Sequence, residues 1–336
     1  MHETDLSKYN LRTDLIIEEE ISQFKNNSYD EDNIHVDDII LEKNNQLNRK
    51  KGKYVTITYS DITDSSNYEK VKNIVIKELY KVLKYCHIKK DDTCLIIGLG
   101  NRKIISDALG SRTLEEIIVT RHMYMIDDVD KNYRNVAILE PNVIGVTGVD
   151  SFEIIISVVK KLKPDFVICI DALCAMNIER LNKTIQITSS GITPGSGIGN
   201  NKEELSYDTL GVPTIAIGIP SVINTSVIVV DTINYLLKKI GYLKNNFDNH
   251  QDKLKPINKI NYLNNLNDLT EKEKKEVLGY IGLLDNNSLK TLIWEVLSPI
   301  NADMIVTTKE IDFIMEKNAK LLGNALNNVL HNIKEN

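Results

Sequence analysis

Short apolar runs and longer amphipathic stretches alternate through the first two thirds of the chain. Each short run is rich in Ile, Val and Leu and is bounded by polar or turn-forming residues, which is the pattern of a buried strand. The runs lie at Tyr54–Tyr59, Thr93–Ile97, Val136–Leu139, Phe166–Ile170, Thr184–Ile187 and Thr214–Ile219. We expect these runs to form the strands of the core.

Apolar residues at helical spacing separate the runs. The clearest stretch, Tyr68–Tyr85, predicts a helix with one apolar face. A second helix is predicted over Ser151–Leu162, ending before Pro164, and a third over Thr225–Ile240, ending at Gly241. Because strands and helices alternate, we expect an α/β fold with a mostly parallel sheet flanked by helices.

Three segments depart from this alternation. Residues 26–53 are polar and rich in charge, which predicts an insertion loop or an irregular arm. Residues 243–268 are rich in Asn and Lys and predict a long connector. Residues 270–336 return to helical periodicity and predict a helical C-terminal region.

Composition narrows the class of protein. Hydrophobic residues make up 42% and charged residues 26%, as in an ordinary globular protein, and the net charge of −6 argues against a nucleic-acid-binding surface. No apolar run approaches the roughly 20 residues that cross a bilayer, and the polar N-terminus resembles no secretion signal, so a cytoplasmic location is expected. Cysteines 86, 94, 169 and 174 have no CxxC spacing, which favours reduced thiols over disulfides.

Glycine-rich turns follow two of the predicted strands. Glycine reaches left-handed backbone conformations without a Cβ clash, so such turns let the chain turn sharply and approach a ligand closely. The candidate residues are Gly98, Gly100 and Asn101 after one strand, and Gly195, Gly197 and Gly199 after another. Their backbone N–H groups could stabilise an oxyanion or cradle a phosphate, or the turns could simply close strand–helix connections.

Two aspartates lie where carboxylates could act as acid and base. Asp171 follows the apolar run Phe166–Ile170, and Asp107 lies shortly after the first glycine turn. Partly desolvated carboxylates at strand ends are candidates for acid–base catalysis. An aspartate at such a place can also cap the next helix, and position alone favours capping for both residues.

Six motifs occur in one order along the chain. They are GLGN…SDALG at 98–110, VTRH at 119–122, PNVIGVTG at 141–148, VICIDALCA at 167–175, TIQI…SGITPGSGIGN at 184–200 and GVPTIAIGIP at 211–220. Together they resemble the germination protease family of spore-forming bacteria, and the resemblance extends from Tyr9–Leu15 to Leu297–Asp312. It covers nearly the whole chain.

The resemblance implies an atypical aspartic endopeptidase that degrades small acid-soluble spore proteins in the spore core. It implies Asp107 and Asp171 as the catalytic pair, no metal or other cofactor, and a homotetramer. Two adjacent carboxylates that share one proton could activate water and protonate the leaving amine. The family's fold is phosphorylase/hydrolase-like and related to that of hydrogenase-maturation endopeptidases.

That related fold leaves an alternative open, in which Asp107, Asp171 and His122 recognise a metal. A lone histidine beside an arginine, such as His122, is more often a structural residue. A further alternative is a non-catalytic, phosphate-binding α/β protein that uses the glycine turns. At Ser189 the sequence departs from the family pattern, which often has an acidic residue in this segment.

The N-terminal segment carries an acidic residue directly before two apolar ones, Asp14-Leu15-Ile16. The resemblance implies a zymogen that removes a short propeptide by self-cleavage at such a junction, here between Asp14 and Leu15. Residues 1–14 would then be the propeptide and residues 15–336 a single protease domain. Alternatively, Asp14 and the following glutamates are only the start signal of a helix.

Overall fold

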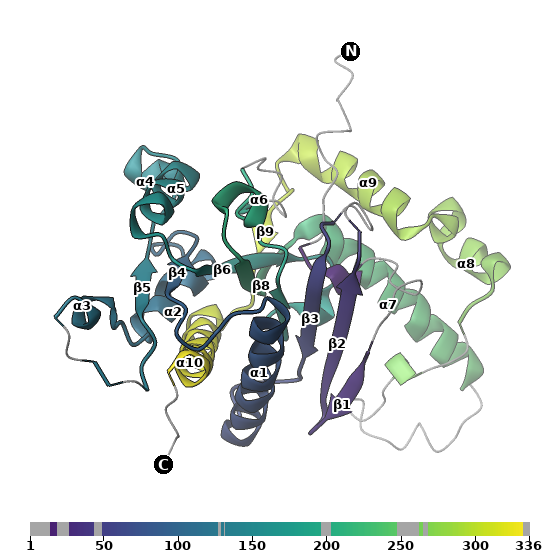
Figure 1. Cartoon of the computed structure of the whole chain (residues 1–336). Helices are drawn as coiled ribbons and strands as arrows, with labels where there is room; N and C mark the ends of the chain where they lie inside the picture. Colours follow the sequence, from purple (N-terminus) through teal and green to yellow (C-terminus); the bar gives the residue numbers. More distant parts are fainter. Residues whose placement is uncertain are drawn as a thin grey trace. The chain divides into compact units, whose positions relative to one another are not determined.

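The computed structural model describes residues 14–18, 27–43, 49–126, 129–130, 132–195, 203–246, 262–264 and 268–331 (Figure 1). The chain divides into two compact units. The larger comprises Met1–Val222 and Thr307–Asn336, and the smaller comprises Ile223–Val306. The chain therefore leaves the larger unit after Val222 and returns to it at Thr307.

The strands of the described ranges belong to one sheet. They are β1 (Tyr29–Glu31), β2 (Ile34–Leu41), β3 (Gly52–Thr58), β4 (Cys94–Gly98), β5 (Val136–Leu139), β6 (Phe166–Ala175), β7 (Thr184–Thr188), β8 (Thr214–Asn224) and β9 (Ile305–Val306). Their order is β1-β2-β3-β7-β8-β6-β4-β5, and β9 pairs with β8. All six predicted strands are present, and Val136–Leu139 has the predicted bounds.

The sheet is mixed, so the expectation of a mostly parallel sheet is wrong. Strand β4 runs parallel to β5 and β6. The neighbouring pairs from β1 through β2, β3 and β7 to β8 are all antiparallel. Much of the antiparallel part comes from residues 26–53, which were expected to be an irregular arm. Polar residues interrupt the apolar pattern by which strands are recognised in the sequence of this hairpin. In the structure these residues are paired: buried Asp37 contacts His35 at 3.3 Å, and Asp38 contacts Lys53 at 2.5 Å.

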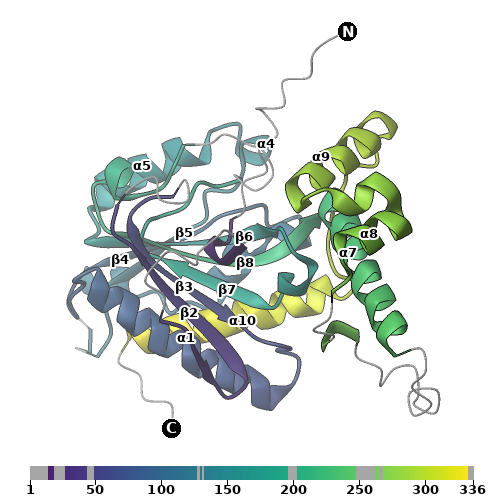
Figure 2. The same cartoon turned by 90° about the vertical axis from the view of Figure 1, so that its right-hand side faces the viewer.

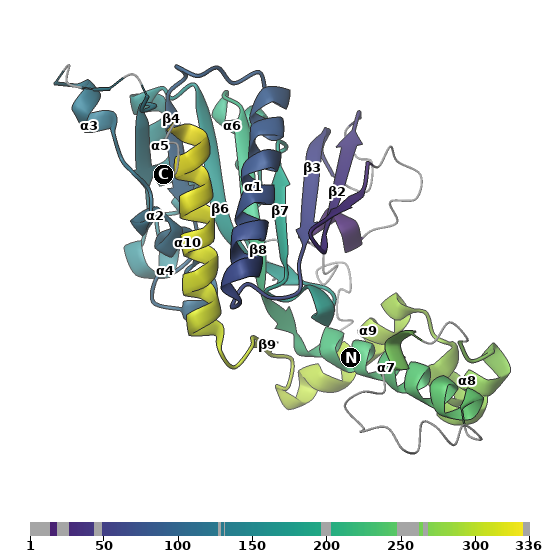
Figure 3. The same cartoon turned by 90° about the horizontal axis from the view of Figure 1, so that it is seen from below.

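Helices cover both faces of the sheet in the larger unit (Figures 2 and 3). On one face, α1 (Ser65–Tyr85), α2 (Leu109–Glu115) and α10 (Ile311–Leu330) pack on a cluster that includes Ile96 and Ile168. On the other face, α5 (Ser151–Leu162) and α6 (Tyr207–Leu210) pack on Leu95 and Val167. Alternate residues of β4 and β6 therefore enter opposite layers.

Short elements connect these layers. They are η2 (Ile16–Glu18), η3 (Ile105–Asp107), α3 (Arg121–Tyr124), α4 (Ile144–Thr147) and η4 (Ile178–Arg180). No helix of the described ranges is long and apolar enough to cross a membrane.

The smaller unit is mainly helical. Its elements are α7 (Thr225–Asn245), η8 (Tyr262–Asn264), α8 (Glu271–Leu278), η9 (Gly279–Leu283), α9 (Asn286–Leu297) and η10 (Ser298–Ile300), together with β9. Helix α7 continues through Gly241, where it was predicted to end. Gly241 is buried and is not among the glycines with positive φ, so it does not adopt the left-handed conformation that ends helices.

Candidate active site

Asp171 lies inside β6, because this strand continues to Ala175 rather than ending at Ile170. Its side chain is almost fully buried, with 6% of the residue exposed, and Oδ1 accepts a hydrogen bond from the N–H of Ala172 at 2.9 Å. Since no helix begins at Asp171, the capping interpretation does not describe it.

Asp107 closes η3 in the connection from β4 to α2. Its Oδ2 accepts a hydrogen bond from the N–H of Asn101 at 2.8 Å, across the turn that follows β4. The residue is half-buried, and the N-cap of α2 is Ala108. The carboxylate of Asp107 therefore bonds back to the glycine turn, and Asp107 does not occupy the cap position.

The first glycine turn allows very close backbone contact. Gly100 has a φ of +96°, and a Cβ on it would come within 2.1 Å of the carbonyl oxygen of Asp107. A Cβ on Gly98 would come within 2.6 Å of the backbone of Gly110. These glycines thus let the segment around Asp107 pack directly on the end of β4.

The N–H of Asn101 is already engaged by Asp107, so the turn is not an open anion cradle at this group. The hypothesis that the turn stabilises an oxyanion remains a prediction. Gly195 has a φ of +73° in the second glycine-rich segment. Gly197 and Gly199 lie outside the described residues.

The structure places Asp107 and Asp171 at the same edge of the sheet. Strands β4 and β6 are parallel neighbours, with Gly98 opposite Ile170, and the N–H of Leu99 donates to the carbonyl of Ile170 at 2.8 Å. Asp171 follows Ile170, and Asp107 lies against the turn that follows Leu99, with η3 in contact with β6. Residues 64 positions apart in sequence thus both lie just beyond the carboxyl end of β4, and such strand ends are the usual place of active sites in α/β sheets.

Arg102 anchors the same connection. Its guanidinium contacts Glu140, directly after β5, at 2.9 Å and 2.5 Å, and Glu115 at the end of α2 at 2.5 Å. The hydrogen bond from Arg102 is the main cause that lowers the pKa of Glu140 below its usual value. The sequence alone did not single out Arg102, because a charged residue in a turn is most often solvated.

His122 is not part of this edge. It is exposed on α3, which begins beside the first residue of β5, since the N–H of Thr120 donates to the carbonyl of Val136 at 3.1 Å. Asp107 and Asp171 lie beyond the opposite end of β4. Within the described ranges, no three His, Cys, Asp or Glu residues are grouped closely enough to hold a metal ion.

The predicted cleavage junction lies within the described residues and is bound by β6 and β7. Oδ2 of Asp14 accepts a hydrogen bond from the N–H of Cys174 at 2.9 Å, three residues beyond Asp171 on β6. Gln186 on β7 donates to the carbonyl of Asp14 at 2.8 Å and accepts from the N–H of Ile16 at 2.7 Å. Leu15 is fully buried. The Asp14–Leu15 bond is thus held against the strand that carries Asp171.

Ser189 has a structural contact at the position where the family often has an acidic residue. Its Oγ accepts a hydrogen bond from the N–H of Lys53 at 2.9 Å, and its own N–H donates to the carbonyl of Lys53 at 3.0 Å. The serine therefore extends the pairing of β3 with β7 by one residue.

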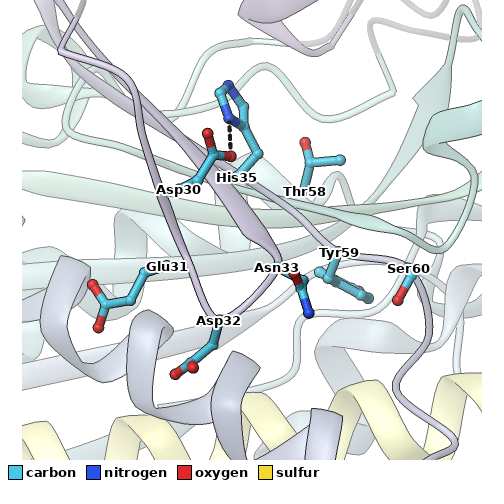
Figure 4. A pocket seen from close by; sticks show the side chains of 8 residues that line it. All are labelled: Asp30, Glu31, Asp32, Asn33, His35, Thr58, Tyr59 and Ser60. Carbon is cyan, nitrogen blue, oxygen red and sulfur yellow. Dashed lines mark hydrogen bonds and ion pairs between the residues drawn. The ribbon is translucent and has the colours of Figure 1, made fainter.

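A pocket of about 630 Å³ lies elsewhere, at the turn between β1 and β2 (Figure 4). It is lined by Asp30, Glu31, Asp32, Asn33, His35, Thr58, Tyr59 and Ser60. Neither Asp107 nor Asp171 lines it. The aspartate pair and this pocket are therefore separate features.

Comparisons with known proteins agree with the sequence motifs. The family model described as germination protease matches residues 4–336. A germination protease of Bacillus velezensis is 40% identical over 98% of this chain and 96% of its own length. Those of Bacillus subtilis and Priestia megaterium are 38% and 37% identical, each over 98% of this chain and 95% and 96% of their own lengths. This chain belongs to the germination protease family.

Proposed function

We propose that this protein is an endopeptidase in which Asp107 and Asp171 together activate water. The observation that carries the proposal is that both residues lie just beyond the carboxyl end of β4, Asp171 within the neighbouring parallel strand β6. Asp171 is nearly buried and Asp107 is half-buried, so the two carboxyl groups differ in solvent contact. Unequal environments are what allow one carboxyl to hold a proton while the other accepts one.

In the proposed reaction, the ionised carboxylate takes a proton from water, and the water oxygen attacks the scissile carbonyl. The protonated carboxyl polarises that carbonyl and then supplies the proton that the leaving amine requires. Burial raises the pKa of the Cys94 and Cys169 thiols, which argues against either being a thiolate nucleophile at neutral pH. In the part of the chain that the structure describes, no three His, Cys, Asp or Glu residues are grouped for the metal alternative.

We further propose small acid-soluble spore proteins as substrates, and the spore-core cytoplasm as the place of action. Both proposals rest on the family, whose described function is germination proteolysis. The protein would be made as a zymogen that cleaves itself between Asp14 and Leu15, and would assemble as a homotetramer. The contact between Asp14 and Cys174 supports the zymogen proposal, because it binds the junction to β6 three residues beyond Asp171.

The test uses Asp107→Asn and Asp171→Asn, which keep the size of each side chain and remove its charge and its acid–base function. Each variant should lose about 10³-fold in cleavage of a small acid-soluble spore protein, the scale of losing an acid–base group. Products are mapped by mass spectrometry, and Asp165→Asn, at the amino end of the same strand, serves as the control. If either site variant cleaves like the unmodified protein, that aspartate has no part in the mechanism.

A further inference from the structure

The peptide group between Ser106 and Asp107 is held at both ends. Its carbonyl oxygen, on Ser106, accepts a hydrogen bond from the Oγ of Ser221 at 2.5 Å. Its N–H, on Asp107, donates to the carbonyl of Ile104 at 2.8 Å. Because a peptide group is planar, fixing both ends fixes the direction in which the backbone enters the Cα of Asp107.

Ser221 is a fully buried residue of β8, more than a hundred positions from Asp107 in sequence. Its hydroxyl donates to Ser106, and its backbone carbonyl accepts a hydrogen bond from the Oγ1 of Thr307 at 2.5 Å. The contacts form a continuous series from Thr307 through Ser221 to the peptide group of Asp107. Ser221 lies just before the chain leaves the larger unit, and Thr307 is the residue at which it returns.

We propose that Ser221 and Thr307 are positioning residues for Asp107. Ser221 holds the peptide group that carries Asp107, and Thr307 holds the backbone of Ser221. The N–H of Asn101 binds the carboxylate itself, so Asp107 is held at its preceding peptide group and at its side chain, and Thr307 acts on it only through Ser221. The inference rests on the proposed role of Asp107 in peptide hydrolysis.

A purely structural role would predict lost stability alone, whereas a positioning role predicts a lower turnover rate at similar substrate affinity. A carboxyl group displaced by a fraction of an ångström is still present but is poorly aligned for proton transfer. Its coupling to the second carboxyl also changes, and that coupling determines the pH dependence of turnover.

The experiment compares Ser221→Ala and Thr307→Val in the full-length protein. Each change removes one hydroxyl. The control is Thr225→Val, whose hydroxyl donates to the carbonyl of Met304 at 2.6 Å and so joins two segments of the smaller unit without reaching Ser106. We measure kcat and KM for a spore-protein substrate, the pH profile of kcat, and thermal unfolding.

For Ser221→Ala we expect kcat to fall roughly 10- to 100-fold, KM to change less than about 3-fold, and one limb of the pH profile to move by about half a unit or more. Thr307→Val should show the same changes at smaller size, and Thr225→Val none. Unchanged kcat and pH profile in both variants, or an equal loss in the control, would overturn the inference. If Ser221→Ala does not fold, the test rests on Thr307→Val, which changes an exposed residue, and the same criteria apply to it.

Asp107→Asn is measured in the same series. If this variant is active, the proposed function fails and the inference fails with it. If it is inactive while Ser221→Ala and Thr307→Val behave like the unmodified protein, only the inference fails.

Discussion

At the scale of single residues, Gly100 connects backbone geometry with the proposed chemistry. It has positive φ, and it leaves no space for a Cβ beside Asp107. Gly211 also has positive φ, at +74°, but a Cβ there would meet nothing within 4 Å. Comparing a substitution at each glycine therefore distinguishes the cost of backbone strain, which both share, from the cost of steric overlap, which only Gly100 has.

We predict that Gly100→Ala lowers the free energy of unfolding by about 3 kcal/mol or more, since overlap adds to the cost of the left-handed backbone. Gly211→Ala should cost only about 1 kcal/mol, the strain alone. Chemical denaturation of both variants measures the difference. Equal losses would show that the backbone at Gly100 relaxes and that the close contact with Asp107 is not restrictive.

Asp14 offers a second residue-scale prediction. Asp14→Ala should block self-cleavage or move it away from Leu15, because the carboxylate that binds the N–H of Cys174 is lost. Glu18→Ala is the matched control, since the carboxylate of Glu18 accepts from the N–H of Met176 at 3.0 Å, one residue past the end of β6. N-terminal sequencing after incubation should find Leu15 in this control. A first residue other than Leu15 in the unmodified protein would show that the junction is misassigned.

The sequence singled out Asp171 because it directly follows an apolar run, and Asp107 because it lies shortly after a glycine turn. Position alone favoured helix capping for both, and their catalytic role comes from the family resemblance and stays a prediction. Arg102 and Ser221 give no such signal, because their importance comes from contacts with Glu140 and Ser106. Such contacts exist only once the strand order is known.

At the scale of elements, local periodicity predicted the central strands and the long helices. It did not predict the antiparallel hairpin of β1 and β2, whose turn at Asp32 and Asn33 has positive φ at two non-glycine residues. It also ended β6 and β8 too early, each by five residues. The reason is physical: buried polar residues such as Asp171 interrupt the apolar pattern without ending the strand.

Helix α10 ends at a buried histidine, His331, that makes two hydrogen bonds. Its Nδ1 accepts from the N–H of Arg134 at 3.2 Å, and its Nε2 lies 3.0 Å from the carbonyl of Ile118. Only the neutral ring with a proton on Nε2 satisfies both contacts. Burial is the main cause that lowers the pKa of His331 below 6.5, and the charge of Arg134 lowers it further.

Because the unfolded chain binds this proton more readily than the folded one, stability should fall as the pH drops below about 6.5. The slope from this residue is at most about 1.4 kcal/mol per pH unit. His331→Gln should remove that slope in urea denaturation series between pH 7.5 and 5. His35 acts oppositely: its hydrogen bond with Asp30 at 2.8 Å raises the pKa of its ring, so it stabilises the fold at lower pH (Figure 4). His35→Gln should therefore steepen the loss, and an unchanged slope in His331→Gln would contradict the assignment.

At the scale of the whole molecule, the smaller unit exposes several large apolar side chains. Leu289 is the one buried residue of α9 in the described chain, and Val296 is 58% exposed. Tyr280 and Ile300 are 78% and 68% exposed. Exposed apolar side chains on the consecutive elements η9, α9 and η10 are candidates for a protein interface.

A second copy of this chain is the occupant we expect for this surface, in line with the proposed homotetramer. Light scattering at micromolar concentration should give an assembly larger than a monomer, and Val296→Glu or Tyr280→Glu should reduce its mass, because each places a charge where apolar surface would be covered. Thr291→Glu adds the same charge to α9 without removing an apolar side chain and should leave the mass unchanged. A monomer in the unmodified protein would exclude self-association through this unit. A mass that falls equally in all three variants would show that added charge, rather than lost apolar contact, is responsible.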